Sequence, residues 1–151
     1  MDEKEREARI LIVEDDPGDV NMIRRFLDDS RIRNKINEVN DGQQALDFLF
    51  QREEYSDAPR PDLILLDLNL PCVDGREVLE KIKEDNSLRH IPVVVLTTSK
   101  DEADVWRSYN LGASSYITKP VDMNQFIDTI RTLQIYWLKV VLLPTEEEKN
   151  E

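Results

Sequence analysis

The segment that most constrains the fold is an apolar run, Leu63 to Leu66, that ends in the acid Asp67. Pro61 precedes this run and Pro71 follows it, so the apolar residues stand between two breaks in regular structure. A short, wholly apolar run predicts a β-strand buried on both faces, as in a parallel sheet covered by helices. Asp67 then lies at the strand end, where α/β proteins place their sites. An isolated acid there also fits an ordinary turn, so the other strand ends decide its meaning.

The rest of the chain repeats this alternation of apolar strands and amphipathic helices. We expect strands at residues 10–13, 36–39, 63–66, 93–96 and 116–117, and helices at about 17–27, 45–50, 78–82, 102–111 and 123–138. Asp16 as N-cap and Pro17 at the first helical position predict the start of the first helix. The polar stretch from Glu53 to Pro61 is expected to be a loop. Short apolar strands joined by helices predict an α/β fold, a doubly wound parallel sheet with right-handed crossovers.

The composition argues against several classes of function. With 20 basic and 32 acidic residues, the 151-residue chain has a formal charge of -12, which would repel nucleic acid and anionic membranes. The only cysteine, Cys72, permits no internal disulfide, and neither a signal peptide nor the roughly 20 apolar residues of a membrane helix can be found. We therefore expect a cytoplasmic protein with no nucleic acid and no membrane among its partners. The only histidine, His90, nearly excludes histidine-based metal sites.

Polar side chains close four of the five expected strands. The first strand is followed by Glu14, Asp15 and Asp16, the third by Asp67, the fourth by Thr97 and Thr98, and the fifth by Lys119. Because the carboxyl ends of the strands meet at one edge, we expect these side chains to form a site. Neighbouring carboxylates repel each other, and a hard cation, Mg²⁺ or alternatively Mn²⁺, relieves that repulsion. We expect Asp15 and Asp67 to bind the ion directly, Glu14 through water, and the backbone carbonyl of Asn69 to complete the protein ligands.

Such a site suits phosphoryl transfer. A metal, the Lys119 ammonium and the Thr97 hydroxyl would stabilise charge on the transferred group, and a carboxylate can be the nucleophile, which gives an acyl phosphate. The chain has only four glycines and no GxxxxGK pattern. We therefore expect no nucleotide-binding site, and phosphate that comes from a separate donor.

Four motifs, in chain order, resemble the response-regulator receiver domain over about residues 8–135: VEDD around Asp15, LLDLNLPCVDG around Asp67, LTTS around Thr97 and YITKP around Lys119. The resemblance implies a flavodoxin-like (βα)5 sheet with strand order 2-1-3-4-5, bound Mg²⁺ and a cis Lys119-Pro120 peptide. It also implies a role for each residue: phosphoacceptor for Asp67, acidic pair for Glu14 and Asp15, switch hydroxyl for Thr97, phosphoryl-stabilising lysine for Lys119 and aromatic switch for Tyr116.

Further segments, RPDLILLDLNLP, DGREVL, IPVVVLTTS and the late Trp137-Leu138, resemble the single-domain regulators that serve phytochrome-type histidine kinases. The resemblance implies a phosphoaccepting signalling protein rather than an enzyme, with a sensor histidine kinase as partner. It also implies a homodimer through the fifth helix and the C-terminal extension. We expect residues 1–151 to form one receiver domain, with a core at about 8–135, a helical extension and an acidic tail. The stripe Phe126, Ile130, Leu133 and Trp137 should face the sheet.

Two alternatives remain open at this point. Haloacid-dehalogenase-type phosphatases also use an Asp nucleophile with Mg²⁺, but their hallmark is DxD, and here Asp67-Leu68-Asn69 lacks the second acid. A phosphate-independent scaffold would not need the acids, the hydroxyl and the lysine together.

Overall fold

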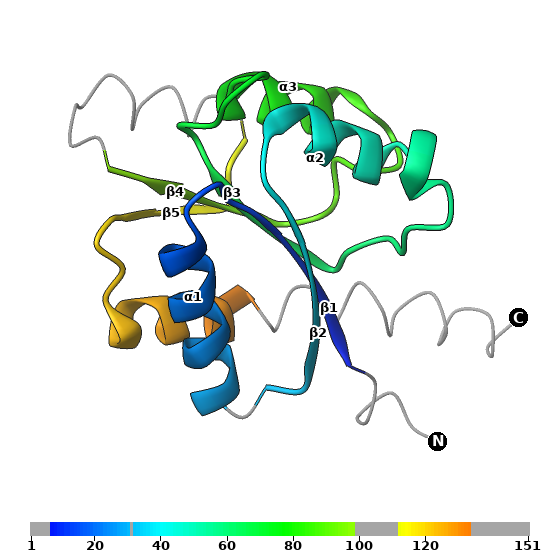
Figure 1. The fold of residues 1–151 in the computed structure, drawn as a ribbon. Helices are drawn as coiled ribbons and strands as arrows, with labels where there is room; N and C mark the ends of the chain where they lie inside the picture. The colour runs from blue at the N-terminus through cyan, green and yellow to red at the C-terminus, as the bar shows by residue number, and fades with distance from the viewer. Residues whose placement is uncertain (1–6, 31, 99–111, 134–151) are drawn as a thin grey trace, which may run out of the picture.

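The computed structural model describes residues 7–30, 32–98 and 112–133, and its centre is a five-stranded sheet in the order β2-β1-β3-β4-β5 (Figure 1). The strands are β1 (Ala8–Val13), β2 (Asn34–Val39), β3 (Leu63–Asp67), β4 (Val93–Thr97) and β5 (Ser115–Thr118), and every neighbouring pair is parallel. The strand order that the resemblance implied is therefore confirmed. Every residue of the central strand β3 is buried, which is why its sequence is apolar up to Asp67.

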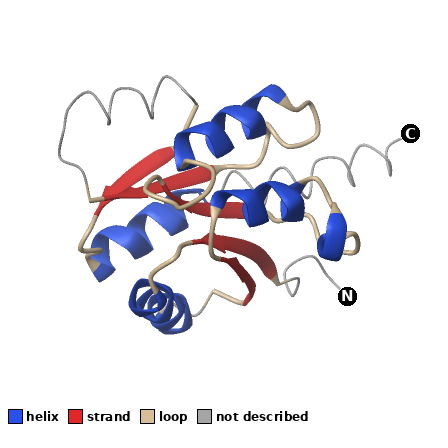
Figure 2. Ribbon diagram, turned by 45° about the horizontal axis from the view of Figure 1, so that its top comes forward, coloured by secondary structure: helices blue, strands red, loops and turns tan. Residues whose placement is uncertain are grey.

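Helices cover both faces of the sheet (Figures 1 and 2). One face carries α1 (Pro17–Asp29) and the helix over residues 123–133, and the other carries α2 (Gly42–Leu49) and α3 (Gly75–Glu84). Each face of the sheet has its own hydrophobic core, and successive residues of β3 belong to different cores. Leu65 packs on the α1 side and Leu66 on the α2–α3 side. The helix expected near residues 102–111 and the sequence beyond 133 lie outside the described residues.

Aspartate caps begin the three helices that follow β1, β2 and β3. Asp16 accepts a hydrogen bond from the Gly18 N–H at 2.9 Å, and Pro17 occupies the first helical position, as the sequence predicts. Asp41 and Asp74 cap α2 and α3 in the same way. Each cap satisfies a free backbone N–H and places a negative charge at the positive end of the helix dipole. Because each of these helices follows a strand in the chain, the caps lie on the side of the sheet where the strands end.

The stretch after α2 differs from the sequence prediction, because Glu53–Tyr55 forms one turn of 3-10 helix where a loop was expected. The cause lies in how α2 ends. Gln51 adopts a φ of 56°, and the Arg52 N–H donates to the Asp47 carbonyl at 2.8 Å, which is the Schellman arrangement. The chain then turns back, and the ring of Tyr55 packs 5.6 Å from that of Phe48. The end of α2 and the packing of Tyr55 on Phe48 thus accompany a turn of 3-10 helix in a segment of polar sequence.

The helix over residues 123–133 packs as its apolar stripe predicts. Phe126, Ile130 and Leu133 are buried against α1 and the sheet, and the Phe126 ring lies 5.9 Å from that of Phe26. Ile127 is partly buried against the same core. Trp137, the last member of the predicted stripe, lies outside the described residues.

Candidate functional site

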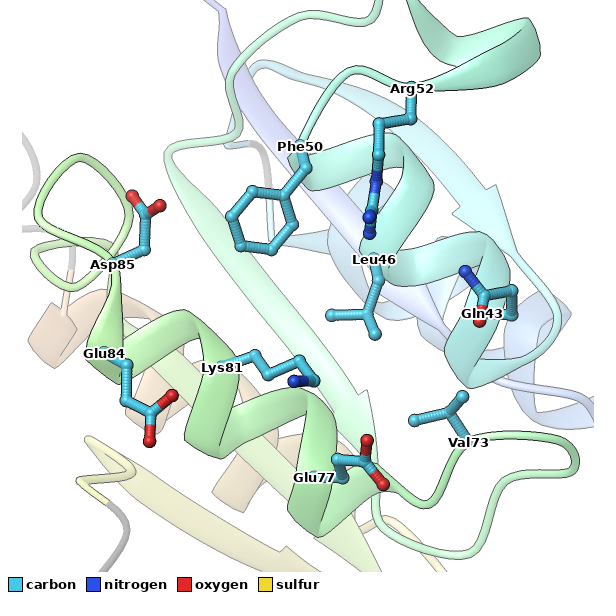
Figure 3. Close-up of a pocket in the computed structure, with 9 residues that line it drawn as sticks. All are labelled: Gln43, Leu46, Phe50, Arg52, Val73, Glu77, Lys81, Glu84 and Asp85. Atoms are coloured by element: carbon cyan, nitrogen blue, oxygen red, sulfur yellow. The ribbon is translucent and has the colours of Figure 1, made fainter.

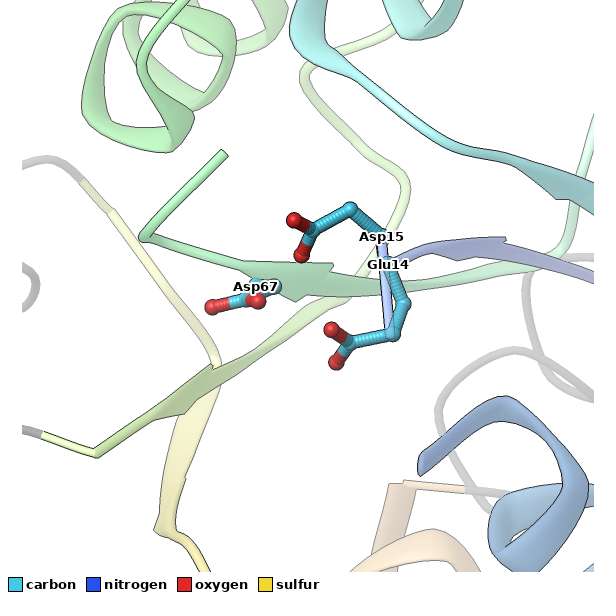
Figure 4. A group of neighbouring side chains, drawn as sticks. All are labelled: Glu14, Asp15 and Asp67. Carbon is cyan, nitrogen blue, oxygen red and sulfur yellow. The ribbon is translucent and has the colours of Figure 1, made fainter. Parts of the chain in front are cut away.

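The acids that follow β1 point to opposite faces of the sheet (Figure 4). Side chains alternate along β1, so that Ile12 faces α1 and Val13 faces α2 and α3. Continued past the strand, this alternation places Glu14 on the α1 side and Asp15 on the α2–α3 side. Asp67 lies between them at the end of β3. One carboxylate oxygen from each of the three residues lies within 4.8 Å of the others, so the predicted acid cluster is present. Glu14 and Asp67 are buried and Asp15 is exposed.

Lys119 reaches into this cluster from the end of β5. Its Nζ lies 2.8 Å from Glu14 Oε1, 2.9 Å from Asp19 Oδ2 and 3.2 Å from Asp67 Oδ2. The backbone holds the residue in place, since the Lys119 N–H donates to the Thr97 carbonyl at 2.8 Å. The Lys119-Pro120 peptide is cis, as the resemblance implied. The structure therefore brings together the lysine and the acids that the sequence predicted.

The third partner of the lysine, Asp19, was missed by the sequence analysis. It lies in the first turn of α1, four residues before Ile23 and eight before Leu27, both of which are buried in the core. Residues at this spacing share one face of a helix, so Asp19 continues the inward-facing row of α1 to its N-terminal end. That spacing, in a helix that begins beside the acid cluster, was the signal that could have revealed it.

Burial and charge shift the pKa values of the central pair. Burial raises the pKa of Glu14 to about 7, and the neighbouring Asp67 adds to this rise while the bond to Lys119 opposes it. Burial lowers the pKa of Lys119, but its bonds to Glu14 and Asp19 and the charge of Asp67 outweigh that effect, so the pKa is raised overall. Lys119 thus remains a fixed positive charge, whereas Glu14 loses its proton near neutral pH.

The loop after β3 fixes the position of the Asp67 side chain. The Asn69 N–H donates to Asp67 Oδ1 at 2.9 Å, and the Asn69 side-chain amide donates to the Thr98 hydroxyl at 3.3 Å. Gly75 packs directly beneath, where an added Cβ would lie 2.4 Å from the Asp67 carbonyl oxygen. Only glycine allows α3 to approach the strand end this closely.

The two predicted switch residues lie on neighbouring strands. Thr97 ends β4 and is buried, and in the register Val95 pairs with Tyr116 and Thr97 with Thr118. Tyr116 therefore lies beside Val95, two residues before Thr97, on the same face of the sheet as Thr97. Its ring packs partly against the core on the α2–α3 side. The roles of Thr97 and Tyr116 as switch residues stay predictions.

The donor set fits a hard divalent cation. Glu14, Asp15 and Asp67 supply oxygen ligands, the kind that Mg²⁺ and Mn²⁺ prefer. Asp15 is exposed, so the cluster is open to solvent on one side. The participation of the Asn69 carbonyl and a water-mediated contact of Glu14 stay predictions.

A separate hollow of about 480 Å³ lies between α2 and α3 (Figure 3). Its apolar lining consists of Leu46, Phe50 and Val73, and charged residues of α3 such as Lys81 border it. None of the residues that line it belongs to the acid cluster. Phosphoryl transfer onto an open strand end needs access for a donor rather than a deep pocket, so this hollow is not required for that chemistry.

A parallel sheet of this order, with clustered acids and a lysine at its carboxyl edge, defines a receiver domain. The chain belongs to the response regulator receiver domain family, whose model matches residues 10–131. It is 44% identical over 143 residues to the response regulator Rcp1 of Synechocystis sp., a match that covers 95% of this chain and 97% of Rcp1. The chain is thus a receiver domain homologous to a response regulator of nearly the same length.

Two solved structures extend the comparison. The phosphorylated cyanobacterial phytochrome response regulator RcpA matches with a TM-score of 0.77 and 44% identity, covering 89% of this chain and 96% of RcpA. The Mn(2+)-bound form of Rcp1 matches with a TM-score of 0.76 and 44% identity, covering 87% of this chain and 95% of Rcp1. The predicted family and the likeness to phytochrome regulators are therefore confirmed. Among the described residues, no helix has the length and apolar character needed to cross a membrane.

Proposed function

We propose that this response regulator accepts a phosphoryl group on Asp67 from a histidine kinase. The observation that carries this assignment is the position of the Asp67 carboxylate. It lies 3.2 Å from the Lys119 ammonium and shares the cluster of Glu14 and Asp15, at the end of the central strand. One Asp67 oxygen forms a bond to phosphorus while the N–P bond of the phosphohistidine breaks. The electron pair leaves with the imidazole nitrogen, which takes up a proton.

The residues around Asp67 have distinct parts in this transfer. Lys119 places a buried positive charge beside the oxygens of the arriving group, and the Thr97 hydroxyl donates to one of them. The Asn69 N–H holds Asp67 Oδ1, which fixes the orientation of the carboxylate. A bound Mg²⁺ or Mn²⁺ would be held by Asp15 and Asp67 directly and by Glu14 through water, and it would supply positive charge that offsets the carboxylates and the phosphoryl oxygens.

The response to phosphorylation is a change in the partner-binding face. Thr97 moves toward the phosphoryl group, and Tyr116 turns inward to fill the space. The chain acts as a phosphoacceptor rather than an enzyme, because no described residue offers a second carboxylate in the DxD position of a phosphatase, where Asn69 stands. The likeness to a cyanobacterial phytochrome response regulator supports a phytochrome-type kinase as the donor.

Labelling with a small donor tests the assignment. Acetyl phosphate with Mg²⁺ should add one phosphate, seen by mass spectrometry of the intact protein, and Asp67→Asn should abolish it. Asp74→Asn is the matched control, because it removes an exposed acid of the same loop while asparagine keeps the helix cap. Undiminished labelling of the Asp67 variant would refute the assignment.

We further propose that the chain is one cytoplasmic receiver domain that forms a homodimer. The helix over residues 123–133 already buries Phe126, Ile130 and Leu133 against its own sheet. The apolar residues 135–138 and 140–143 then continue the sequence beyond that stripe. A two-fold contact through this extension would bury them. Light scattering should give a dimer for the full chain and a monomer for a chain that ends at Leu133; a monomeric full chain at tens of micromolar would contradict it.

A further inference from the structure

The bond between Asp19 and Lys119 uses a donor that the phosphoryl group also needs. An ammonium has three N–H donors. Nζ donates to Asp19 Oδ2 at 2.9 Å and to Asp67 Oδ2 at 3.2 Å, and it also forms an ion pair with Glu14 Oε1 at 2.8 Å. The longest of these contacts is the one to Asp67. In the unphosphorylated protein, the lysine is therefore held more closely by two other acids than by the proposed phosphoacceptor.

Asp19 differs from the other two acids in its surroundings. The Asp19 side chain is 25% exposed, whereas those of Glu14 and Asp67 are 0% and 4% exposed. Asp19 lies outside the group of carboxylates that could share a metal ion, and it comes from α1 rather than from a strand end. Water can replace the lysine as the partner of a partly exposed carboxylate, but not as the partner of a buried one. The bond to Asp19 is thus the one that is most easily given up.

We infer that Asp19 is a positioning residue that competes with the phosphoryl group for Lys119, an inference that rests on the proposed function of Asp67. An arriving phosphoryl group adds several oxygen acceptors beside Nζ, and these oxygens compete with Asp19 for the N–H donors of the lysine. Asp19 also adds a negative charge to a site that must bind an anion. Both effects favour the unphosphorylated state and lower the affinity of the site for the phosphoryl group.

The test is the binding of beryllofluoride, a non-covalent analogue of a phosphoryl group on a carboxylate. The protein is titrated with beryllium chloride in excess fluoride and Mg²⁺, and the NMR signal of the Asn69 N–H, which is bonded to Asp67 Oδ1, reports binding. Asp19→Asn should bind about three- to tenfold more tightly than the wild type, because the neutral amide competes less strongly than a partly exposed carboxylate for the lysine. Asp19→Glu restores the charge and should return the affinity toward that of the wild type.

Asp16→Asn is the matched control. It removes the same charge from the start of the same helix and keeps the cap, but the Asp16 carboxylate accepts from the Gly18 N–H rather than from Lys119. An equal gain in both variants would assign the effect to charge alone and overturn the inference, as would an unchanged or weaker affinity of Asp19→Asn. A wild-type protein that binds no beryllofluoride would instead contradict the proposed function of Asp67.

Discussion

Glu14 Oε1 lies 2.8 Å from Lys119 Nζ, and the two side chains are only 0% and 10% exposed. The pair joins the ends of β1 and β5, which are separated in the sheet by β3 and β4. The Asp67 carboxylate, at the end of β3, contacts the same nitrogen at 3.2 Å. The lysine therefore spans the carboxyl edge of the sheet, and its charge holds two buried acids beside each other.

The stability of the metal-free protein should fall as pH rises through the window in which Glu14 titrates. The pKa of Glu14 is raised from 4.5 to about 7, so the native state binds more protons than the unfolded state between these values. The free energy of unfolding then decreases with rising pH, by at most about 3 kcal/mol from this group. Glu14→Gln lacks the titration, so its stability relative to the wild type should increase from pH 5 to pH 8. Urea unfolding in EDTA measures the unfolding free energy of both proteins at each pH. If the wild type and Glu14→Gln showed the same dependence on pH, the prediction would be contradicted.

Lys119→Met should destabilise the metal-free protein and make its stability depend on Mg²⁺. The substitution leaves the buried carboxylates of Glu14 and Asp67 without their cation, which costs about 3 kcal/mol. Added Mg²⁺ should raise the Tm of this variant more than that of the wild type, because the ion replaces part of the lost charge. Lys83→Met is the control, since Lys83 bonds to the carbonyls of Arg89 and Ile91 rather than to acids. Equal effects of Mg²⁺ on all three proteins would refute this explanation.

Gly75→Ala should displace the end of β3. The new Cβ would lie 2.4 Å from the Asp67 carbonyl oxygen and 2.6 Å from Leu68 Cα, and both are backbone atoms that cannot rotate away. We expect a loss of at least about 2 kcal/mol in unfolding free energy and slower labelling by acetyl phosphate. Gly18→Ala serves as the control, because its Cβ would meet only the Asp16 side chain at 3.3 Å. A Gly75 variant with wild-type stability and labelling would contradict the close approach.

Removal of the metal should stop phosphorylation without unfolding the protein. Labelling by acetyl phosphate should cease in excess EDTA and return with Mg²⁺ or Mn²⁺. Asp15→Asn should weaken Mg²⁺ binding, measured by calorimetry, by about tenfold, because it removes one of three carboxylates from the cluster. Asp16→Asn should bind Mg²⁺ nearly as the wild type does, since its carboxylate caps α1. Labelling that persists in EDTA would exclude a metal-dependent transfer.

Local sequence was sufficient to predict the position of a side chain wherever that position depends only on the strand or helix that carries it. The apolar runs predicted β3 and β4, and Asp16 with Pro17 predicted the start of α1. The strand ends then predicted which polar residues share an edge, since a parallel sheet brings all its carboxyl ends together. The order of the strands came from the resemblance to receiver domains, because five similar apolar strands can be arranged in more than one way.

Sequence alone thus determined the chemical composition of the site: clustered acids, a hydroxyl and a lysine at the edge of a parallel sheet. Only the tertiary structure decided how they pair. The sequence does not predict that Lys119 lies closer to Asp19 and Glu14 than to Asp67, because any of these acids could pair with its charge. The choice depends on how α1 packs on the sheet and on the register of β5, which are properties of the folded chain as a whole.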